Sequence, residues 1–446
     1  MRQFMHWSAQ LRNDDTMTSL TRHLPPSFKP VDYLLGTLLL AYPALLFLFQ
    51  GGMNGSLFLI AGISILLLIA RRRDFVDAFD RPAMLFGITM ASGIAVVLVS
   101  QLYHDDLRGR YFDSDARFLL AVPVMLVLRQ LNQKTLSLIQ YALPLGAIAA
   151  LAKVMAIDPT VTGYASTPFL NHIHLGDLSL LLAILSLMSL NWFEKDGPLV
   201  KALKIAGFLA GMVVCVLSSA RGGWLAVPVI VAVTLYSRNR HRFARRLLFA
   251  MSAIAAALVL GYFFVDRVHE RLWMIYSDLT SYSAGQKDTS VGIRLQLWKA
   301  AAHMIAEHPI LGVGADGFGR AMDGLSASGV ITQDAAAYGK GEVHNEILAQ
   351  TVRFGIFGLF FILALYFVPF LLFFRAEKTA DRVKKLAAVF GMCVTLGFFV
   401  FGLTVETFDL KMTAAFYSLT VAVLLAIAIN RHVPGKSEAS GGVLAN

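Results

Sequence analysis

The sequence predicts an all-α polytopic integral membrane protein. Apolar residues make up 57% of its 446 residues, charged residues make up only 15%, and the mean hydropathy is +0.63. Soluble domains contain about 45–50% apolar and about 25% charged residues. Because lipid cannot satisfy a free backbone N–H or carbonyl group, such a chain crosses a membrane as helices. The composition excludes a soluble enzyme with a single apolar patch and favours one bundle of membrane helices.

Long apolar runs predict about twelve membrane-spanning helices, since each span needs about 20 apolar residues. The predicted spans are residues 33–50, 56–70, 83–103, 117–129, 137–156, 174–192, 203–219, 223–237, 247–265, 351–374, 386–404 and 412–430. Those at 56–70, 117–129 and 223–237 are short. We expect these three to begin within their flanking loops or to be broken helices that line a cavity.

The positions of the basic residues predict the orientation of the chain. The net charge is +10, and basic clusters follow predicted spans at residues 71–73, 238–246 and 375–385. Basic loops stay in the cytoplasm, so both termini are expected there. The predicted organisation is listed in chain order as a cytoplasmic N-terminal segment 1–32, spans one to nine in 33–265, a long outer loop 266–350, spans ten to twelve in 351–430, and a cytoplasmic tail 431–446.

Three smaller observations limit the alternatives. Residues 1–30 are polar and basic, so we expect no cleaved signal peptide. The two cysteines, Cys215 and Cys393, lie inside apolar runs, and neither suggests a disulfide framework or a thiolate metal site. No convincing internal repeat is visible, which counts against a transporter built from inverted repeats.

The first motif with chemical potential is SSARGGWLA, residues 218–226, between the seventh and eighth spans. Arg221 is expected at the outer membrane boundary, where Gly222 and Gly223 allow a tight turn and close approach of the backbone to a ligand. An arginine there is either a helix-end side chain that reaches toward water or an anion clamp with bidentate donors for phosphate.

The second motif is VGIRLQLWKAAAHMIAEHPILGVG, residues 291–314, in the long loop. Helical spacing places four residues on one stripe, namely Arg294, Trp298, Ala301 and Ile305. A solvated arginine avoids an apolar stripe, so the Arg294 head is expected to reach a polar pocket or a buried salt bridge. The proline and glycines at the end of the motif predict a sharp turn.

The third motif is GEVHNEILAQTVRFGIFGLF, residues 341–360, where the tenth span begins. His344 lies there, directly after a stretch at 326–342 that is expected to be flexible. An imidazole suits general base catalysis near neutral pH, although a single interfacial histidine is also often structural. Glu346 and Gln350 are predicted supporting partners, and His303 and His308 are weaker candidates for the base.

The sequence predicts no metal site and no nucleotide cofactor. Asp113 and Asp115 form an FDSD pair in an outer loop and could hold a divalent ion, but a plain polar loop is the favoured interpretation. His172 and His174 are too few for a metal site without further ligands. No phosphate-binding loop of the GxxxxGK[ST] kind is present, so nothing indicates ATP.

Together, the three motifs resemble the O-antigen ligase family of bacterial envelope enzymes. The matching elements are SSARGGW, RLQLWKAAAHMIAEHPILGVG and HNEILAQTVRFGIFG, in the family's order and with the long outer loop holding the second. The motifs cover roughly residues 218–360, whereas the first half matches only in span count and general character. The combination is typical of the ligase/polymerase superfamily and less specific for one member.

The resemblance implies an inverting, metal-independent glycosyltransferase of a Gram-negative inner membrane, active on the periplasmic face. The implied donor is a polysaccharide on undecaprenyl pyrophosphate, and the acceptor is an outer-core sugar hydroxyl of lipid A-core. By motif match, His344 falls on the family's essential histidine, and Arg221 and Arg294 fall on the arginines that hold the pyrophosphate. No cofactor and no nucleic acid are implied.

Three alternatives remain at this point. An O-antigen polymerase of the same superfamily uses another lipid-linked repeat unit as acceptor, and a protein O-oligosaccharyltransferase uses a serine or threonine. The short tail after Asn430 mildly favours the ligase. A solute transporter is the third alternative, but transporters carry charged groups near the membrane midplane, and here the candidate groups lie at one outer face.

Overall fold

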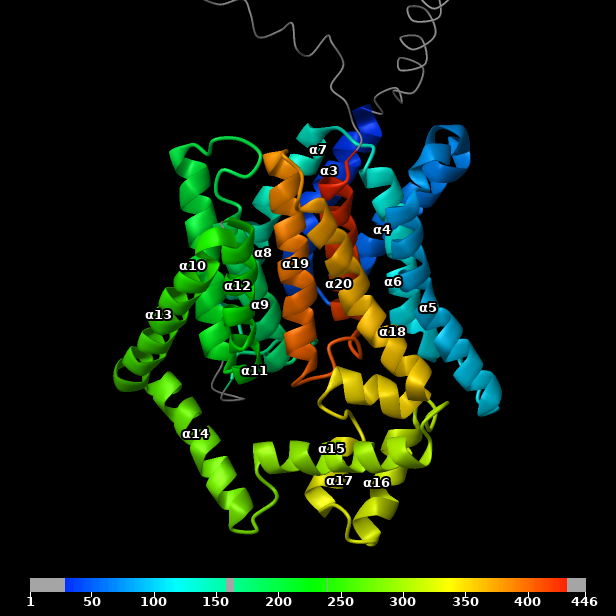
Figure 1. Ribbon diagram of the computed structural model, residues 1–446, viewed down its shortest axis with the longest axis vertical. Helices are drawn as coiled ribbons and strands as arrows, with labels where there is room; N and C mark the ends of the chain where they lie inside the picture. Colours follow the sequence, from blue (N-terminus) through cyan, green and yellow to red (C-terminus); the bar gives the residue numbers. More distant parts are fainter. Residues whose placement is uncertain (1–28, 158–163, 239, 431–446) are drawn as a thin grey trace, which may run out of the picture.

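The chain folds into helices. The computed structural model describes residues 29–157, 164–238 and 240–430, and these contain no β-strand, only one isolated bridge between Thr167 and Leu170. Long helices pack side by side as a bundle, and a smaller group of helices lies at one end of it (Figure 1). The predicted all-α class is therefore confirmed.

Nine helical segments of the described chain are long and apolar enough to cross a membrane. They are α3 (Lys29–Leu48), α4 (Gly52–Ala70), α5 (Arg81–Tyr103), α7 and α8 (Gln133–Ser137, Ile139–Met155), α10 (Pro198–Ser218), η4 and α13 (Arg240–Arg242, Phe243–Phe264), α18 (Glu346–Ala376), α19 (Arg382–Gly402) and α20 (Lys411–Ala428). The protein is thus a polytopic membrane protein.

Three shorter helices also coincide with predicted spans: α6 (Asp113–Leu128), α9 (His172–Met188) and α12 (Ala226–Arg238). Two of the segments predicted to be short, 117–129 and 223–237, are indeed short helices. The run 56–70 begins within its flanking loop, as expected for one of the short runs: the helix starts at Gly52, where Asn54 lowers the hydropathy but accepts a 2.8 Å hydrogen bond from Arg117 Nε. With nine long and three short helices, the number of spans stays a prediction.

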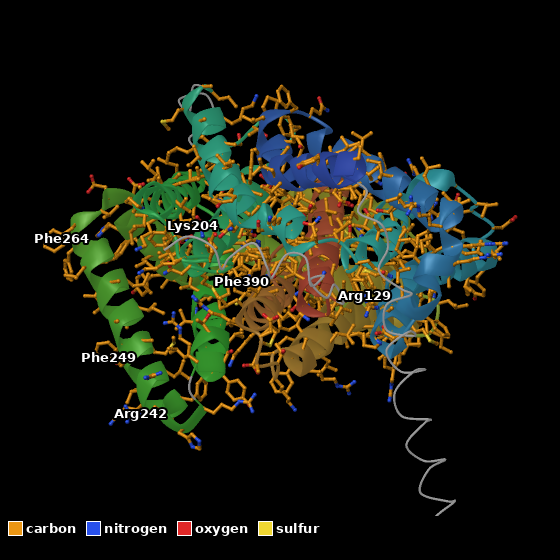
Figure 2. All side chains as sticks on the ribbon, turned by 90° about the horizontal axis from the view of Figure 1, so that it is seen from above. Arg129, Lys204, Arg242, Phe249, Phe264 and Phe390 are labelled. Carbon is orange, nitrogen blue, oxygen red and sulfur yellow. The ribbon has the colours of Figure 1, made fainter. Side chains whose placement is uncertain are left out.

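Burial separates the centre of the bundle from its margin. In α20, 89% of the apolar window is buried inside the protein, and in α19 the share is 78%. In α13 the share is 0%, and Phe249 and Phe264 of this helix lie at the outer edge of the molecule (Figure 2). Since lipid is as apolar as a protein core, α13 is stable in this position only within a membrane.

Small residues bring the helices of the first half into close contact. A Cβ atom added to Gly207 of α10 would lie 2.5 Å from Pro144 of α8, and one added to Gly211 would lie 2.5 Å from the Ser179 carbonyl oxygen of α9. Membrane helices associate through such close backbone approaches, because no hydrophobic effect drives them together in lipid.

Two of the three predicted basic clusters meet at one end of the bundle, which we call the basic end. Glu377, after α18, accepts a 2.7 Å hydrogen bond from Ser237 Oγ and forms ion pairs with Arg240 (3.1 Å) and Lys385 (3.2 Å). Arg240 and Lys385 therefore lie close together, as a common cytoplasmic side for the two clusters requires. Two of the smaller elements, η1 (Arg72–Ala78) and α7, lie on the same side.

Buried cations also fix this end. Lys204 Nζ of α10 is fully buried and lies 2.9 Å from Asp196 Oδ1, 2.9 Å from Gln140 Oε1 and 2.7 Å from the Ser189 carbonyl. Arg129 makes two hydrogen bonds to Asp80, at 3.0 and 2.9 Å. Figure 2 shows both cations inside the outline of the bundle. Each buried charge is thus paired, as its desolvation demands.

The opposite end, which we call the loop end, carries four helices between α13 and α18: α14 (Asp266–Ser283), α15 (Ser290–Glu307), α16 (Gly317–Ala327) and α17 (Gln333–Gly339). Helices α15 to α17 enclose a second apolar cluster that includes Leu297, Met322 and Val352. The stretch 326–342, which we expected to be flexible, contains α17, whose first turn is capped by Thr332.

The glycine-rich turn after α15 packs against a break in α18. Gly355 interrupts the helical conformation of α18 with φ 62° and ψ −145°, and Ile356 N donates to Pro309 O (2.9 Å). Gly314 N, with φ 80°, donates to Arg353 O at 3.0 Å. A side chain on Gly312 or Gly355 would collide with the facing backbone, so the two glycines permit this contact.

Candidate active site

His344 lies in the connection between α17 and α18 and has an unusual backbone. Its φ is +58°, in the left-handed region that residues other than glycine rarely adopt, and its side chain is 14% exposed. Nδ1 lies 2.7 Å from Oε1 of Glu342, as an ion-pair contact without the geometry of a linear hydrogen bond. A strained histidine with a carboxylate beside it is typical of a functional position.

The connection between α19 and α20, residues 403–410, holds the backbone on both sides of His344. Val343 N–H donates to Oε1 of the fully buried Glu406. Asn345 Nδ2 donates to the Leu403 carbonyl at 3.2 Å, while its Oδ1 caps the first turn of α18. These contacts over-determine the conformation of His344, which explains how the strained backbone persists.

Glu342 is a charged partner for the imidazole. Burial raises the pKa of this carboxyl, but the contact with His344 and the charges of His344 and His174 lower it by more, so the net pKa lies below the usual value. The carboxylate therefore stays ionised at neutral pH. Such a carboxylate fixes the ring orientation of a histidine and stabilises the imidazolium that forms when the ring takes a proton.

Arg294 lies on α15 within electrostatic range of the same carboxylate. Its side chain is half-buried, and burial lowers its pKa while the charges of Glu342 and Asp278 raise it. A guanidinium remains charged at neutral pH in any case. The predicted stripe is present, with Ala301 fully buried and Trp298 half-buried. The buried Trp298 Nε1–H has no partner in the described structure, which leaves a donor one helical turn from Arg294.

The glycine motif forms a short helix, α11 (Arg221–Trp224), which begins at Arg221. A Cβ added to Gly222 would overlap Thr404, and one added to Gly223 would overlap the Asp177 carboxylate of α9. The glycines therefore permit close packing of α11, rather than the open approach to a ligand that we expected. Because Thr404 follows Leu403, the 403–410 connection contacts both α11 and the residues flanking His344.

The two predicted supporting residues, Glu346 and Gln350, lie in the first turns of α18. Glu346 is fully buried, accepts a 2.9 Å hydrogen bond from Phe408 N, and accepts another of 2.8 Å from Gln350 Nε2. Glu346 thus attaches α18 to the 403–410 connection, and Gln350 supports Glu346 from one turn further along the same helix. His303 pairs with Glu307 at 3.4 Å on a half-exposed surface.

The predicted weak metal candidates occupy packed positions. Asp113 begins α6 and pairs with Lys411, so the FDSD pair lies in a helix and not in a loop. Asp115 is buried against Gly93. His172 stacks on Tyr164 with 4.7 Å between the rings. Within the described residues, no group of three or more His, Cys, Asp or Glu side chains is arranged to hold a metal.

Sequence reasoning missed Glu342, Glu406 and Asp177. Glu342 stands two residues before His344 in the same motif, and its acidic type was the available signal. Glu406 lies about 60 residues away in sequence, so only the fold reveals its contact with Val343. Asp177, in α9, has two buried oxygens with no partner in the described structure.

Comparison with known proteins fits this geometry. The family model described as O-antigen ligase matches residues 206–363, which include Arg221, Arg294 and His344. The chain is 22% identical over 246 residues to an O-antigen ligase of Escherichia coli, covering 51% of this chain and 57% of that ligase. It is 26% identical over 290 residues to an uncharacterised protein of Haemophilus influenzae, covering 64% of this chain and 71% of that protein.

These matches support membership of the chain in the O-antigen ligase superfamily. All three sequence motifs lie within the matched residues 206–363, and the family suggests a glycosyltransferase-type activity. The family match spans α10 to α18 and contains the dyad of Glu342 and His344.

Proposed function

We propose that this superfamily member is an O-antigen ligase. It transfers a polysaccharide from undecaprenyl pyrophosphate to an outer-core sugar hydroxyl of lipid A-core, at the periplasmic face of the inner membrane. The observation that carries the proposal is the carboxylate–imidazole pair of Glu342 and His344, with the Arg294 guanidinium in electrostatic range. The reaction needs a base for a hydroxyl and a cation for a leaving pyrophosphate, and these residues supply both.

In the proposed reaction, His344 Nε2 takes the proton of the acceptor hydroxyl while Glu342 holds Nδ1. The hydroxyl oxygen forms a bond to the anomeric carbon as the bond from that carbon to the pyrophosphate oxygen breaks. In-line attack inverts the anomeric configuration. Negative charge grows on the pyrophosphate, and arginines oriented in advance stabilise it without reorganisation.

Arg294 and Arg221 are the proposed pyrophosphate ligands. Arginine forks match phosphate oxygens bidentately, and the unpaired Trp298 N–H on the Arg294 face adds a neutral donor. The two guanidinium groups supply the charge that a divalent metal supplies in other glycosyltransferases. Activity of the purified protein is therefore expected to persist in EDTA, and loss in EDTA with recovery on adding Mg²⁺ would contradict this part.

The deciding experiment is a purified-component assay with lipid-linked polysaccharide as donor and three alternative acceptors. These are lipid A-core, a lipid-linked repeat unit, and a peptide containing serine and threonine. Transfer to lipid A-core alone supports the ligase. Extension of the repeat unit would instead identify a polymerase, and labelling of the peptide would identify a protein oligosaccharyltransferase. An Arg294→Ala variant that binds donor normally would remove that residue from the proposed site.

A further inference from the structure

A cavity of about 430 Å³ lies beside the dyad at the loop end. Its walls come from the α5–α6 connection, which contains η2 (Gly109–Phe112), from α16, from the α17–α18 connection, from the first turns of α18, and from the 403–410 connection with the start of α20. Glu342 lines the cavity and also contacts His344 Nδ1. The cavity therefore borders the side chain that orients the proposed base.

The basic residues of the cavity wall are already neutralised. Each of its five lysines and arginines lies within 4.0 Å of a carboxylate, in the pairs Arg110–Asp316, Arg320–Asp106, Lys340–Asp323, Arg353–Glu406 and Lys411–Asp113. A pyrophosphate needs cations that are free to bind it. The cavity is consequently suited to an uncharged polar ligand rather than to the head of the donor lipid.

Both polar and aromatic groups line the wall. Gln350 Oε1 is a buried acceptor with no partner in the described structure, which invites a hydroxyl donor from a ligand. Tyr111, Phe354 and Phe408 supply aromatic surface from three different elements. A sugar ring has both the hydroxyl donors and the apolar C–H face that such a wall accommodates.

We propose that this cavity binds the sugars of the acceptor glycan and presents its hydroxyl to His344. This rests on the proposed function. The transferred sugar of the donor is bonded to pyrophosphate and must stay near Arg294 on α15, whereas the acceptor must approach the base from another direction. The cavity is the route for this approach, because Glu342 belongs both to the cavity wall and to the Glu342–His344 dyad.

Gly341 offers a way to fill the cavity without disturbing the fold. It lines the cavity, and a Cβ added there would meet only the Tyr338 carbonyl, at an ordinary 3.5 Å. The test series is Gly341→Ala, Gly341→Leu and Gly341→Trp. The matched control is Gly324→Trp on the exposed side of α16, where an added Cβ meets nothing within 4 Å.

The readout is binding of delipidated core oligosaccharide to the purified full-length protein, measured by saturation-transfer NMR without donor. We expect affinity to fall with side-chain size, by at least about tenfold for Gly341→Trp, while Gly341→Ala and Gly324→Trp bind as the wild type does. Tyr111→Leu, in the part of the wall that η2 contributes, is expected to weaken the same binding. Affinity for lipid-linked donor should be unchanged in every variant with a wild-type melting temperature.

Two results would overturn the inference: undiminished oligosaccharide binding by Gly341→Trp, or loss of binding to donor polysaccharide instead. A ligation assay run in parallel separates this from the proposed function. If wild type and Gly324→Trp never ligate to lipid A-core, the ligase assignment fails. If Gly341→Trp ligates with an unchanged KM for lipid A-core, the ligase assignment stands and only the cavity assignment fails.

Discussion

At the residue scale, the proposed chemistry depends on a short strained connection. His344 adopts φ +58°, and its neighbours Val343 and Asn345 are both held by the 403–410 connection. The strain is stable because the fold over-determines it. The imidazole is therefore oriented before substrate arrives, with Glu342 on one ring nitrogen and the other free for a proton.

His344→Ala is expected to lower turnover by about 10²–10⁴-fold, the usual contribution of a general base. Donor binding should survive because the arginines remain. His344→Gln should be nearly as inactive, since an amide hydrogen-bonds but does not accept the proton. The measurement is single-turnover transfer from lipid-linked polymer to lipid A-core. A His344→Gln protein at close to the wild-type rate would restrict His344 to an orienting role.

Glu342→Gln is expected to lower turnover by roughly 10- to 100-fold, because the carboxylate charge that stabilises the imidazolium is lost. The amide keeps the shape of the side chain but not its charge, so the KM for donor should hold while kcat falls. A rise in the KM for donor as large as the fall in kcat would mean that Glu342 contributes to donor binding instead of positioning His344.

The same variant carries a pH signature. The folded pKa of Glu342 is lowered, so the carboxylate contributes stability that is fully present above the unfolded pKa and is lost as pH falls through the folded pKa. The melting temperature of wild type should exceed that of Glu342→Gln by a constant amount from about pH 6 to 8, and the difference should shrink below about pH 4. A difference that grows on acidification would contradict the assignment.

At the scale of elements, close packing at glycines positions the helices that carry the site. In α11, an added Cβ at Gly223 would overlap Asp177, whereas one at Gly62 of α4 meets nothing within 4 Å. In a helix without such contacts, Gly→Ala stabilises by up to about 1 kcal/mol. Whether Gly→Ala stabilises or destabilises the protein therefore depends on which atoms face the glycine.

Gly223→Ala is expected to destabilise the protein by about 1–3 kcal/mol, as overpacking does, and to impair ligation because α11 moves with Arg221. Gly62→Ala is the control and should be neutral or slightly stabilising. Thermal unfolding in detergent, followed on both variants, measures the difference. Equal melting temperatures would show that α11 tolerates displacement from α9.

The buried pair of Lys204 and Asp196 is a second test of an element contact, between α10 and the connection that precedes it. Their side chains are 0% and 1% exposed. Lys204→Met should destabilise by about 3–5 kcal/mol because it leaves a buried carboxylate unpaired. The double variant Lys204→Met/Asp196→Asn should recover part of this loss, and a double variant less stable than the single one would argue against charge burial as the cause.

For the whole molecule, hydropathy was enough to predict the helices but not their arrangement. The bilayer requires long apolar runs, and each predicted run coincides with a helix. Hydropathy carries no information about the break at Gly355, which depends on the facing turn at Pro309. The candidate site was also only partly predictable from the sequence. His344 and Arg294 stand in recognisable motifs, whereas Glu406 acts through a contact with a residue about 60 positions away in the sequence.

The orientation of the molecule in the membrane is the remaining prediction at this scale. Two of the basic clusters meet around Glu377, and α14 to α17 lie at the opposite end of the bundle (Figure 1), so a positive-inside arrangement puts the loop end in the periplasm. Gln286 is exposed at the loop end, and Lys195 is exposed in the α9–α10 connection at the basic end.

Cysteines placed at these two positions should differ in labelling by an impermeant thiol reagent applied to spheroplasts. Gln286→Cys should label directly, and Lys195→Cys only after permeabilisation. The native Cys215 and Cys393 are buried and should stay unlabelled in the folded protein, so they supply the background control. The predicted topology has an odd number of membrane crossings between residues 195 and 286. Labelling of both introduced cysteines from outside would contradict this topology. It would also contradict the proposed periplasmic location of His344.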